Sequence, residues 1–183
     1  IACRHLPTAY NLLARVAALK AGETVLIMGA AGNLGSIGVQ IAKQMLGATV
    51  IAAAGSAERV ATAMALGADH GVDYGTQDLT AAVMDLTDGR GVDVVYDNIA
   101  NPKVLGKAID SMARFGRFVT AGAHGGPVAP VNFFTFYDRK LTIIGSSGSL
   151  EEDYAPCLAA AAAGKIKLIY EHIFPLSQAA AAH

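Results

Sequence analysis

The sequence has 183 residues, 53% of them hydrophobic and 16% charged, which suits a single tightly packed domain with fewer charges than the roughly 25% of an ordinary soluble protein. The net charge is −1 and the 14 Lys and Arg residues form no basic stripe, so we expect no nucleic-acid partner. No apolar run reaches the roughly 20 residues that cross a bilayer, so we expect no membrane partner either.

The first part of the chain predicts a strand–helix–strand unit. After a helical pattern over residues 8–19, the apolar run 24–28 is typical of a strand that is buried on both faces. A helical pattern over about 34–45 follows, and residues 49–53 form the next apolar run. The two runs and the helix between them match a parallel crossover.

The alternation then continues to about residue 144. Further helices are expected over about 57–66, 79–86 and 104–112, and further strands over 71–73, 92–96, 116–120 and 141–144. Six strands with intervening helices predict an α/β fold with a doubly wound parallel six-stranded sheet, the three-layer αβα Rossmann fold. Residues 150–164 then form an alanine-rich helical pattern, and residues 168–174 have the pattern of a strand.

A glycine-rich turn joins the first strand to its helix. It reads Ala30-x-Gly32-x-x-Gly35, which is the dinucleotide fingerprint with Ala30 in place of the first glycine. Gly32 would let a pyrophosphate approach, Gly35 would let helix and strand pack closely, and Asn33 and Leu34 would place free backbone N–H groups at the helix start. The alternative is that these glycines serve only a tight turn. We favour a dinucleotide site because the turn lies between a buried strand and a helix.

The end of the second strand indicates which dinucleotide binds. An acidic residue at this place would hold the ribose 2′-hydroxyl of NAD, but the sequence has none there. Ser56 and Arg59 follow instead, and a hydroxyl and a guanidinium suit a 2′-phosphate. We therefore expect NADP(H) in preference to NAD(H). The alternative is that Ser56 is a helix N-cap and Arg59 part of a solvated first turn.

Several stretches match one family in the same order over nearly the whole chain: residues 8–10, 25–35, 66–70, 89–97, 141–146 and 163–166. They resemble the cofactor domain of the medium-chain dehydrogenase/reductases, the superfamily of zinc-type alcohol dehydrogenases and quinone oxidoreductases. The resemblance implies an oxidoreductase that transfers a hydride between NADPH and a carbonyl, quinone or enone substrate. No catalytic residue can be named from it.

The resemblance also implies a domain organisation. Residues 1–166 would form the dinucleotide-binding domain, and residues 167–183 would be a tail that returns to an N-terminal catalytic (GroES-like) domain. Because the sequence begins at Ile1 within a helical pattern, we expect it to be a fragment of a longer chain. Such a fragment would bind NADPH but turn over little.

The family further suggests which residues contact the cofactor. Arg59 and Tyr74 would hold the 2′-phosphate, the alternative for Tyr74 being a turn aromatic that covers the sheet edge. Asn98 and Ile99 would lie on the adenosine side. The nicotinamide side would be formed by Thr8, Ala121, Gly122, Ala123, Ser146 and Gly148.

The sequence indicates no metal site. The two cysteines, Cys3 and Cys157, lie in no C-x-x-C pair, which fits a reducing cytoplasm. Cys3 falls one residue out of register with the last catalytic zinc ligand of the family, so we expect a structural thiol, and zinc in the parent protein stays open. His124 is the best histidine for a polar contact near nicotinamide and substrate, whereas His70 is expected to be structural.

Two other functions fit the same fold. One is a non-catalytic NADPH-binding sensor module. The other is an S-adenosylmethionine-binding methyltransferase-like domain, which usually has a looser glycine turn and an acidic residue after the second strand. The resemblance also predicts a homodimer through the last strand, residues 141–146, because an exposed apolar edge tends to pair.

Overall fold

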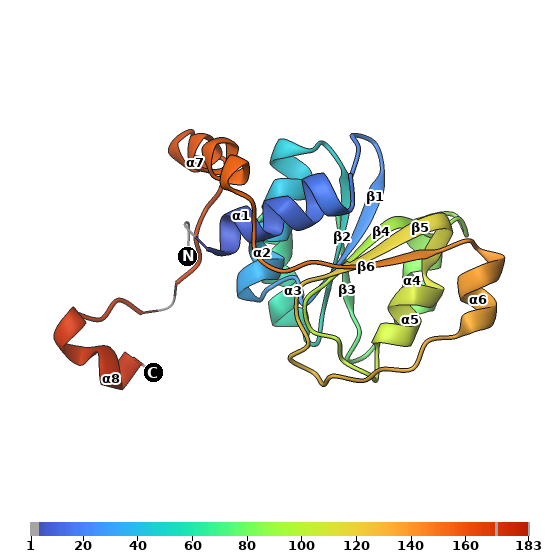
Figure 1. The fold of residues 1–183 in the computed structure, drawn as a ribbon. Coiled ribbons are helices and arrows are strands. Elements are labelled where there is room, and N and C mark those ends of the chain that lie inside the picture. The colour runs from blue at the N-terminus through green and yellow to red at the C-terminus, as the bar shows by residue number, and fades with distance from the viewer. Residues whose placement is uncertain (1–3, 171, 183) are drawn as a thin grey trace.

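A parallel sheet lies at the centre of the fold, with helices on both of its faces (Figure 1). The computed structural model describes residues 4–170 and 172–182. Within them the strand order is β3-β2-β1-β4-β5-β6, and all neighbours are parallel. The strands are β1 (Thr24–Met28), β2 (Thr49–Ala54), β3 (His70–Asp73), β4 (Val92–Asp97), β5 (Met112–Thr120) and β6 (Thr142–Gly145). This order confirms the expected doubly wound Rossmann sheet.

The central strands are apolar on both faces because each face is covered by helices. In β1, Val25 and Ile27 point into one core cluster and Leu26 and Met28 into the other. All four are at most 2% exposed. Continuous apolar runs of this kind are what a parallel sheet between two helix layers requires.

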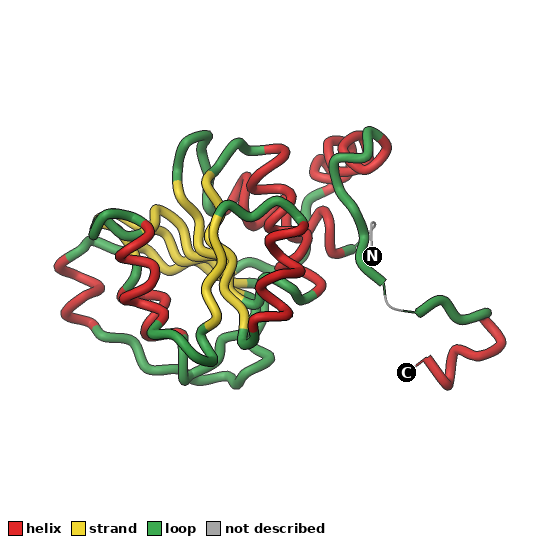
Figure 2. Tube along the Cα trace, turned by 180° about the vertical axis from the view of Figure 1, so that it is seen from behind, coloured by secondary structure: helices red, strands yellow, loops and turns green. Residues whose placement is uncertain are grey.

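The helices form the two outer layers, which Figure 2 shows in red on either side of the yellow strands. One layer contains α1 (His5–Tyr10), α2 (Asn33–Gln40), α3 (Ala57–Ala65) and α7 (Tyr154–Ala162). The other contains α4 (Leu79–Leu86), α5 (Leu105–Asp110) and α6 (Phe133–Asp138). Two of the helices continue as π-helical segments, α1 into η1 (Asn11–Val16) and α2 into η2 (Ile41–Met45).

Two expected elements differ from the structure before β6, and one helix was not expected. The first helix begins at His5 and its π-helical continuation ends at Val16, rather than spanning 8–19. Strand β5 begins four residues before the expected start, with a register shift against β4. Helix α6 was not expected, because its 6 residues are too short a run to establish a helical period after a loop rich in Gly and Pro. Its one local signal is Asn132, whose side chain accepts hydrogen bonds from two backbone N–H groups of the first turn.

The chain after β6 leaves the sheet. It forms η3 (Glu151–Asp153), α7, η4 (Leu176–Gln178) and α8 (Ala179–Ala182). The strand expected over 168–174 is not formed in the described part of this segment, because no other strand lies beside it to accept its hydrogen bonds. The ribbon of Figure 1 shows α8 apart from the sheet, and the view from behind in Figure 2 agrees.

Some expectations concern residues 1–3, 171 and 183, which lie outside the described residues. The role expected for Cys3 is one of them. In the described part of the chain, no helix combines the length and the apolar character needed to cross a membrane.

Candidate cofactor-binding site

A cleft of about 820 Å³ lies at the carboxyl ends of the central strands. Nucleotide ligands of doubly wound sheets bind at this edge, where β1 is flanked by β2 on one side and β4 on the other. The volume is in the range of small-molecule and cofactor sites. The cleft is lined by His5, Met28, Gly29, Ala31, Gly32, Asn33, Leu34, Gly35, Ala54, Gly55, Glu58, Arg59, Thr62, Tyr74, Asn98, Ile99, His124 and Ile169.

The glycine turn forms the floor of the cleft. Gly29 has a φ of +61°, and the turn is closed by the Gly32 N–H, which donates to the Gly29 carbonyl oxygen at 2.8 Å. A Cβ on Gly35 would lie 2.1 Å from that same oxygen, so the helix can approach the turn only because Gly35 has no side chain. This is the close packing that the fingerprint predicts for its last glycine.

The start of α2 presents unpaired backbone donors to the cleft. Gly32 is the N-cap of α2 and supplies no capping side chain. The first N–H groups of a helix have no acceptor within the helix, and Asn33, Leu34 and Gly35 all line the cleft. Such a helix start attracts phosphate. Ala30 contributes differently, because it is fully buried and its N–H donates to the Ala53 carbonyl oxygen.

Arg59 and Tyr74 meet at the β2–β3 end of the cleft. The Tyr74 ring lies over Gly55, where a Cβ would come within 3.3 Å of the ring. Burial raises the pKa of the Tyr74 hydroxyl, and the charge of Arg59 opposes this shift. Arg59 belongs to none of the ion pairs in the described part of the chain. Its guanidinium is therefore available to an anion.

Ser56 does not line the cleft with them. It is the N-cap of α3, and its hydroxyl oxygen accepts a hydrogen bond from the Arg59 backbone N–H at 3.4 Å. This position agrees with the alternative from the sequence, in which Ser56 is a helix N-cap. Glu58, in the same helical turn, does line the cleft.

Asn98 and Ile99 lie at the other side of β1, in the loop after β4. The side chain of Asn98 is buried next to the Tyr96 hydroxyl, and within the described residues neither of its amide atoms forms a hydrogen bond of good geometry. Ile99 packs against Gly29, whose Cβ would lie 2.5 Å from the Ile99 Cδ1 atom. Asp97 holds this loop, since its carboxylate accepts from the Ala100 N–H at 2.8 Å, and burial raises its pKa.

The residues expected on the nicotinamide side do not line the cleft. The Thr8 hydroxyl donates to the Arg4 carbonyl oxygen at 2.7 Å. The Ser146 hydroxyl donates to the Asn11 side chain at 3.2 Å. The others are Ala121, Gly122, Ala123 and Gly148, which lie in the loops after β5 and β6. Of the residues expected around nicotinamide, only His124 borders the cleft.

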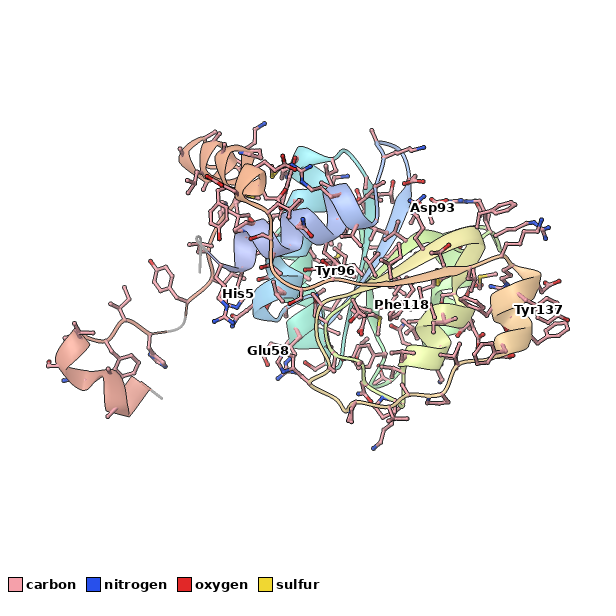
Figure 3. All side chains as sticks on the ribbon, viewed as in Figure 1. His5, Glu58, Asp93, Tyr96, Phe118 and Tyr137 are labelled. Carbon is pink, nitrogen blue, oxygen red and sulfur yellow. The ribbon has the colours of Figure 1, made fainter. Side chains whose placement is uncertain are left out.

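Some lining residues were missed by sequence reasoning, notably His5, Glu58, Thr62 and Ile169. Figure 3 shows His5 and Glu58, which come from different helices, in the same region of the molecule. Ile169 reaches the cleft because the backbone of Lys167, two residues earlier, exchanges two hydrogen bonds with the buried Gln40 side chain of α2. Only Glu58 had a local signal, namely its place beside Arg59.

The cleft fits a dinucleotide phosphate. It offers a glycine cradle and helix N–H groups for a pyrophosphate, and a free guanidinium for a further phosphate. Among the described residues no group of three or more His, Cys, Asp or Glu side chains is placed to hold a metal ion.

Comparison with known proteins agrees with this geometry. The chain is 34% identical to a 2-haloacrylate reductase of Burkholderia sp over 186 residues, which cover 96% of this chain and 55% of that protein. It is 32% identical to an NAD-dependent alcohol dehydrogenase of Sulfolobus acidocaldarius, with 98% and 51% covered. The chain thus spans about half the length of the curated relatives it matches.

A solved structure and a family model support the same grouping. A 2-octenoyl-CoA carboxylase reductase, solved with NADP and 2-octenoyl-CoA, superposes with a TM-score of 0.85 at 26% identity, covering 98% of this chain and 44% of that one. Residues 33–163 match the model of the family described as zinc-binding dehydrogenase. The chain therefore belongs to the zinc-binding dehydrogenases of the medium-chain dehydrogenase/reductase superfamily and corresponds to their C-terminal cofactor-binding domain.

Proposed function

We propose that this chain binds NADP(H) as the cofactor domain of an oxidoreductase that transfers a hydride between NADPH and a carbonyl, quinone or enone substrate. The observation that carries the proposal is the single cleft that joins the glycine turn to Arg59 and Tyr74. The bound cofactor supplies the hydride, while the residues of this chain bind and orient it. The described residues contribute no group that we assign to proton transfer.

The cofactor preference rests on the residues at the β2–β3 end of the cleft. One compared structure contains NADP and one relative is named NAD-dependent, so the family alone does not decide between them. No acidic residue ends β2, and the unpaired Arg59 suits a 2′-phosphate. Glu58 brings a negative charge to the same end, so we propose a moderate preference for NADP(H).

The Arg59→Gln variant tests this preference. We expect its Kd for NADPH to rise about tenfold, because a charge-assisted phosphate contact is lost, and its Kd for NADH to stay within about twofold. Isothermal titration calorimetry with both cofactors measures the two values, and Arg114→Gln, an arginine outside the cleft, is the matched control. Equal affinity of the unmodified chain for NADH and NADPH would refute the preference, as would an unchanged Kd in Arg59→Gln.

The family bears on the two other functions that fit the fold. Membership of the zinc-binding dehydrogenases removes the support for an S-adenosylmethionine-binding domain. Turnover by the longer parent protein would exclude a pure NADPH sensor. A reducing cytoplasm is our proposed location, in keeping with the free, buried Cys157.

We also propose that the chain forms a homodimer through β6, which is the last strand of the sheet. Its Ile143 is 42% exposed, and the exposed aromatic residues Phe133, Phe134 and Tyr137 lie on the helix just before it. An apolar edge with unpaired backbone groups favours pairing with a second copy.

The Ile143→Lys variant is expected to shift this dimer to monomer, because a lysine on the edge opposes strand pairing. Sedimentation velocity over a concentration series measures the change. Leu158→Lys, at an exposed position of α7, should leave the dimer intact. A monomeric wild-type chain at high concentration would contradict the proposal.

A further inference from the structure

The described tail passes along α2 on its way to the cofactor cleft. Ile166, the first residue of this segment, is 6% exposed and belongs to the core cluster that contains residues of α1 and α2. Three residues later, Ile169 lines the cleft. We call residues 166–169 the tail strap. The strap therefore runs from the core to the edge of the sheet where a dinucleotide would lie.

The Gln40 side chain holds the strap in place. It is 2% exposed, its Nε2 donates to the Lys167 carbonyl oxygen at 2.9 Å, and its Oε1 accepts from the Lys167 N–H at 2.7 Å. The amide thereby pairs with the backbone of Lys167 as a neighbouring strand would. Its Nε2 also donates to the Ser36 carbonyl oxygen at 3.1 Å, which fixes the direction of the side chain. Because a buried amide without partners would destabilise the fold, these contacts are the physical reason for a glutamine at this position.

Ile169 is an apolar side chain at a place that a ligand can cover. It is 40% exposed and borders the cleft. Within the described residues, the next hydrogen bond along the tail is that of Gln178 to Pro175, so Lys167 is the anchor nearest to Ile169. Cofactor sites are lined mainly by apolar side chains, and covering exposed apolar surface favours binding. The side chain of Ile169 suits a ring or sugar face of the ligand, and not a phosphate.

We propose that the tail strap is part of the cofactor site: Ile169 contacts the bound dinucleotide, and Gln40 is the positioning residue that holds Ile169 against it. The inference rests on the proposed function, because it requires NADPH in the cleft. Strap position and cofactor binding favour each other, so bound NADPH fixes the strap and a fixed strap strengthens binding. Residues 167–169, which were expected to belong to the tail, would then act with the cofactor-binding domain.

A double-mutant cycle of NADPH affinity tests the positioning role. We expect Ile169→Ala and Gln40→Met each to raise the Kd for NADPH about fivefold. The double variant should also show about a fivefold rise rather than about 25-fold, because Gln40 acts only through Ile169. Gln40→Met keeps the length of the side chain, and water can reach the backbone of the exposed Lys167, so the variant should fold. Gln44→Met, at an exposed position one turn further along, is the matched control and should leave the Kd unchanged.

Limited proteolysis measures the position of the strap directly. Trypsin cleaves after Lys167, and saturating NADPH should slow this cleavage about tenfold in the wild type and much less in Gln40→Met. Additive effects in the cycle, an unchanged Kd in Ile169→Ala, or cleavage that NADPH does not slow would overturn the inference while the wild type binds NADPH, and would leave the proposed function standing. A Gln40→Met variant that does not fold would overturn the positioning role. If the wild type does not bind NADPH, the proposed function fails and this inference fails with it.

Discussion

The Gly35→Ala variant is expected to lose NADPH binding and about 2–3 kcal/mol of its free energy of unfolding. The new Cβ would lie 2.1 Å from the Gly29 carbonyl oxygen, 2.8 Å from the Gly29 carbonyl carbon and 3.0 Å from the Ala30 Cα. All three are backbone atoms, so the clash can be relieved only by moving α2 away from the turn. Its N–H groups would then leave the place where a pyrophosphate binds.

Urea unfolding and calorimetric titration with NADPH measure the two losses separately. Gly106→Ala, in the first turn of α5, is the matched control, because its Cβ would meet no atom closer than 4.0 Å. Alanine is the better helix residue, so this control should gain about 0.5–1 kcal/mol and keep its NADPH affinity. Normal stability and binding in Gly35→Ala would contradict the role assigned to the turn.

The fold was predictable where local pattern and burial agree. The bounds expected for β1 and α4 match those of the structure, because one is a continuous apolar run and the other has an Asp78 N-cap and an apolar face. Where tertiary context decides, the prediction was wrong. The apolar segment around Ile169 has the composition of a strand, but it does not join the sheet: Lys167 hydrogen-bonds the Gln40 side chain, and Ile169 lies at the rim of the cleft.

The candidate site was predictable only in part for a similar reason. The glycine turn and Arg59 are visible locally, since each lies at the end of a recognisable strand and the start of a helix. His5 and Asn98 are 93 positions apart, and no local pattern joins them. The resemblance predicted that the loops after β5 and β6 contact the nicotinamide. Of the residues in these two loops, only His124 lines the cleft.

A buried carboxylate connects the first helix to the C-terminal part of the chain. Asp153 is fully buried and pairs with the Arg15 guanidinium. It also accepts hydrogen bonds from the Asn11 side chain at 2.9 Å and from the Leu150 N–H at 2.8 Å. Through Asn11 the network continues to the Ser146 hydroxyl, so it fixes the loop after β6 as well as the start of α7.

The Asp153→Ala variant is expected to lose about 3 kcal/mol of its free energy of unfolding, because it leaves the Asn11 amide and the Arg15 guanidinium without their shared acceptor. Urea unfolding at pH 7 measures the loss. Glu152 pairs with the same arginine on the surface, so Glu152→Ala should cost less than about 1 kcal/mol. A similar loss of unfolding free energy in the two variants would contradict a stabilising role for the buried network.

The same network predicts how stability changes in acid. Burial raises the pKa of Asp153, but the hydrogen bonds from Arg15, Leu150 and Asn11 outweigh it and hold the pKa below its ordinary value. A carboxyl whose pKa is lower in the folded state stabilises the fold above the unfolded pKa of about 4, and this contribution is lost as the pH falls through the folded pKa. The stability difference between the wild type and Asp153→Asn should therefore be constant from pH 7 to about pH 5 and shrink below pH 4. A difference that stays constant down to pH 2.5 would mean that the charge of Asp153 does not stabilise this fold.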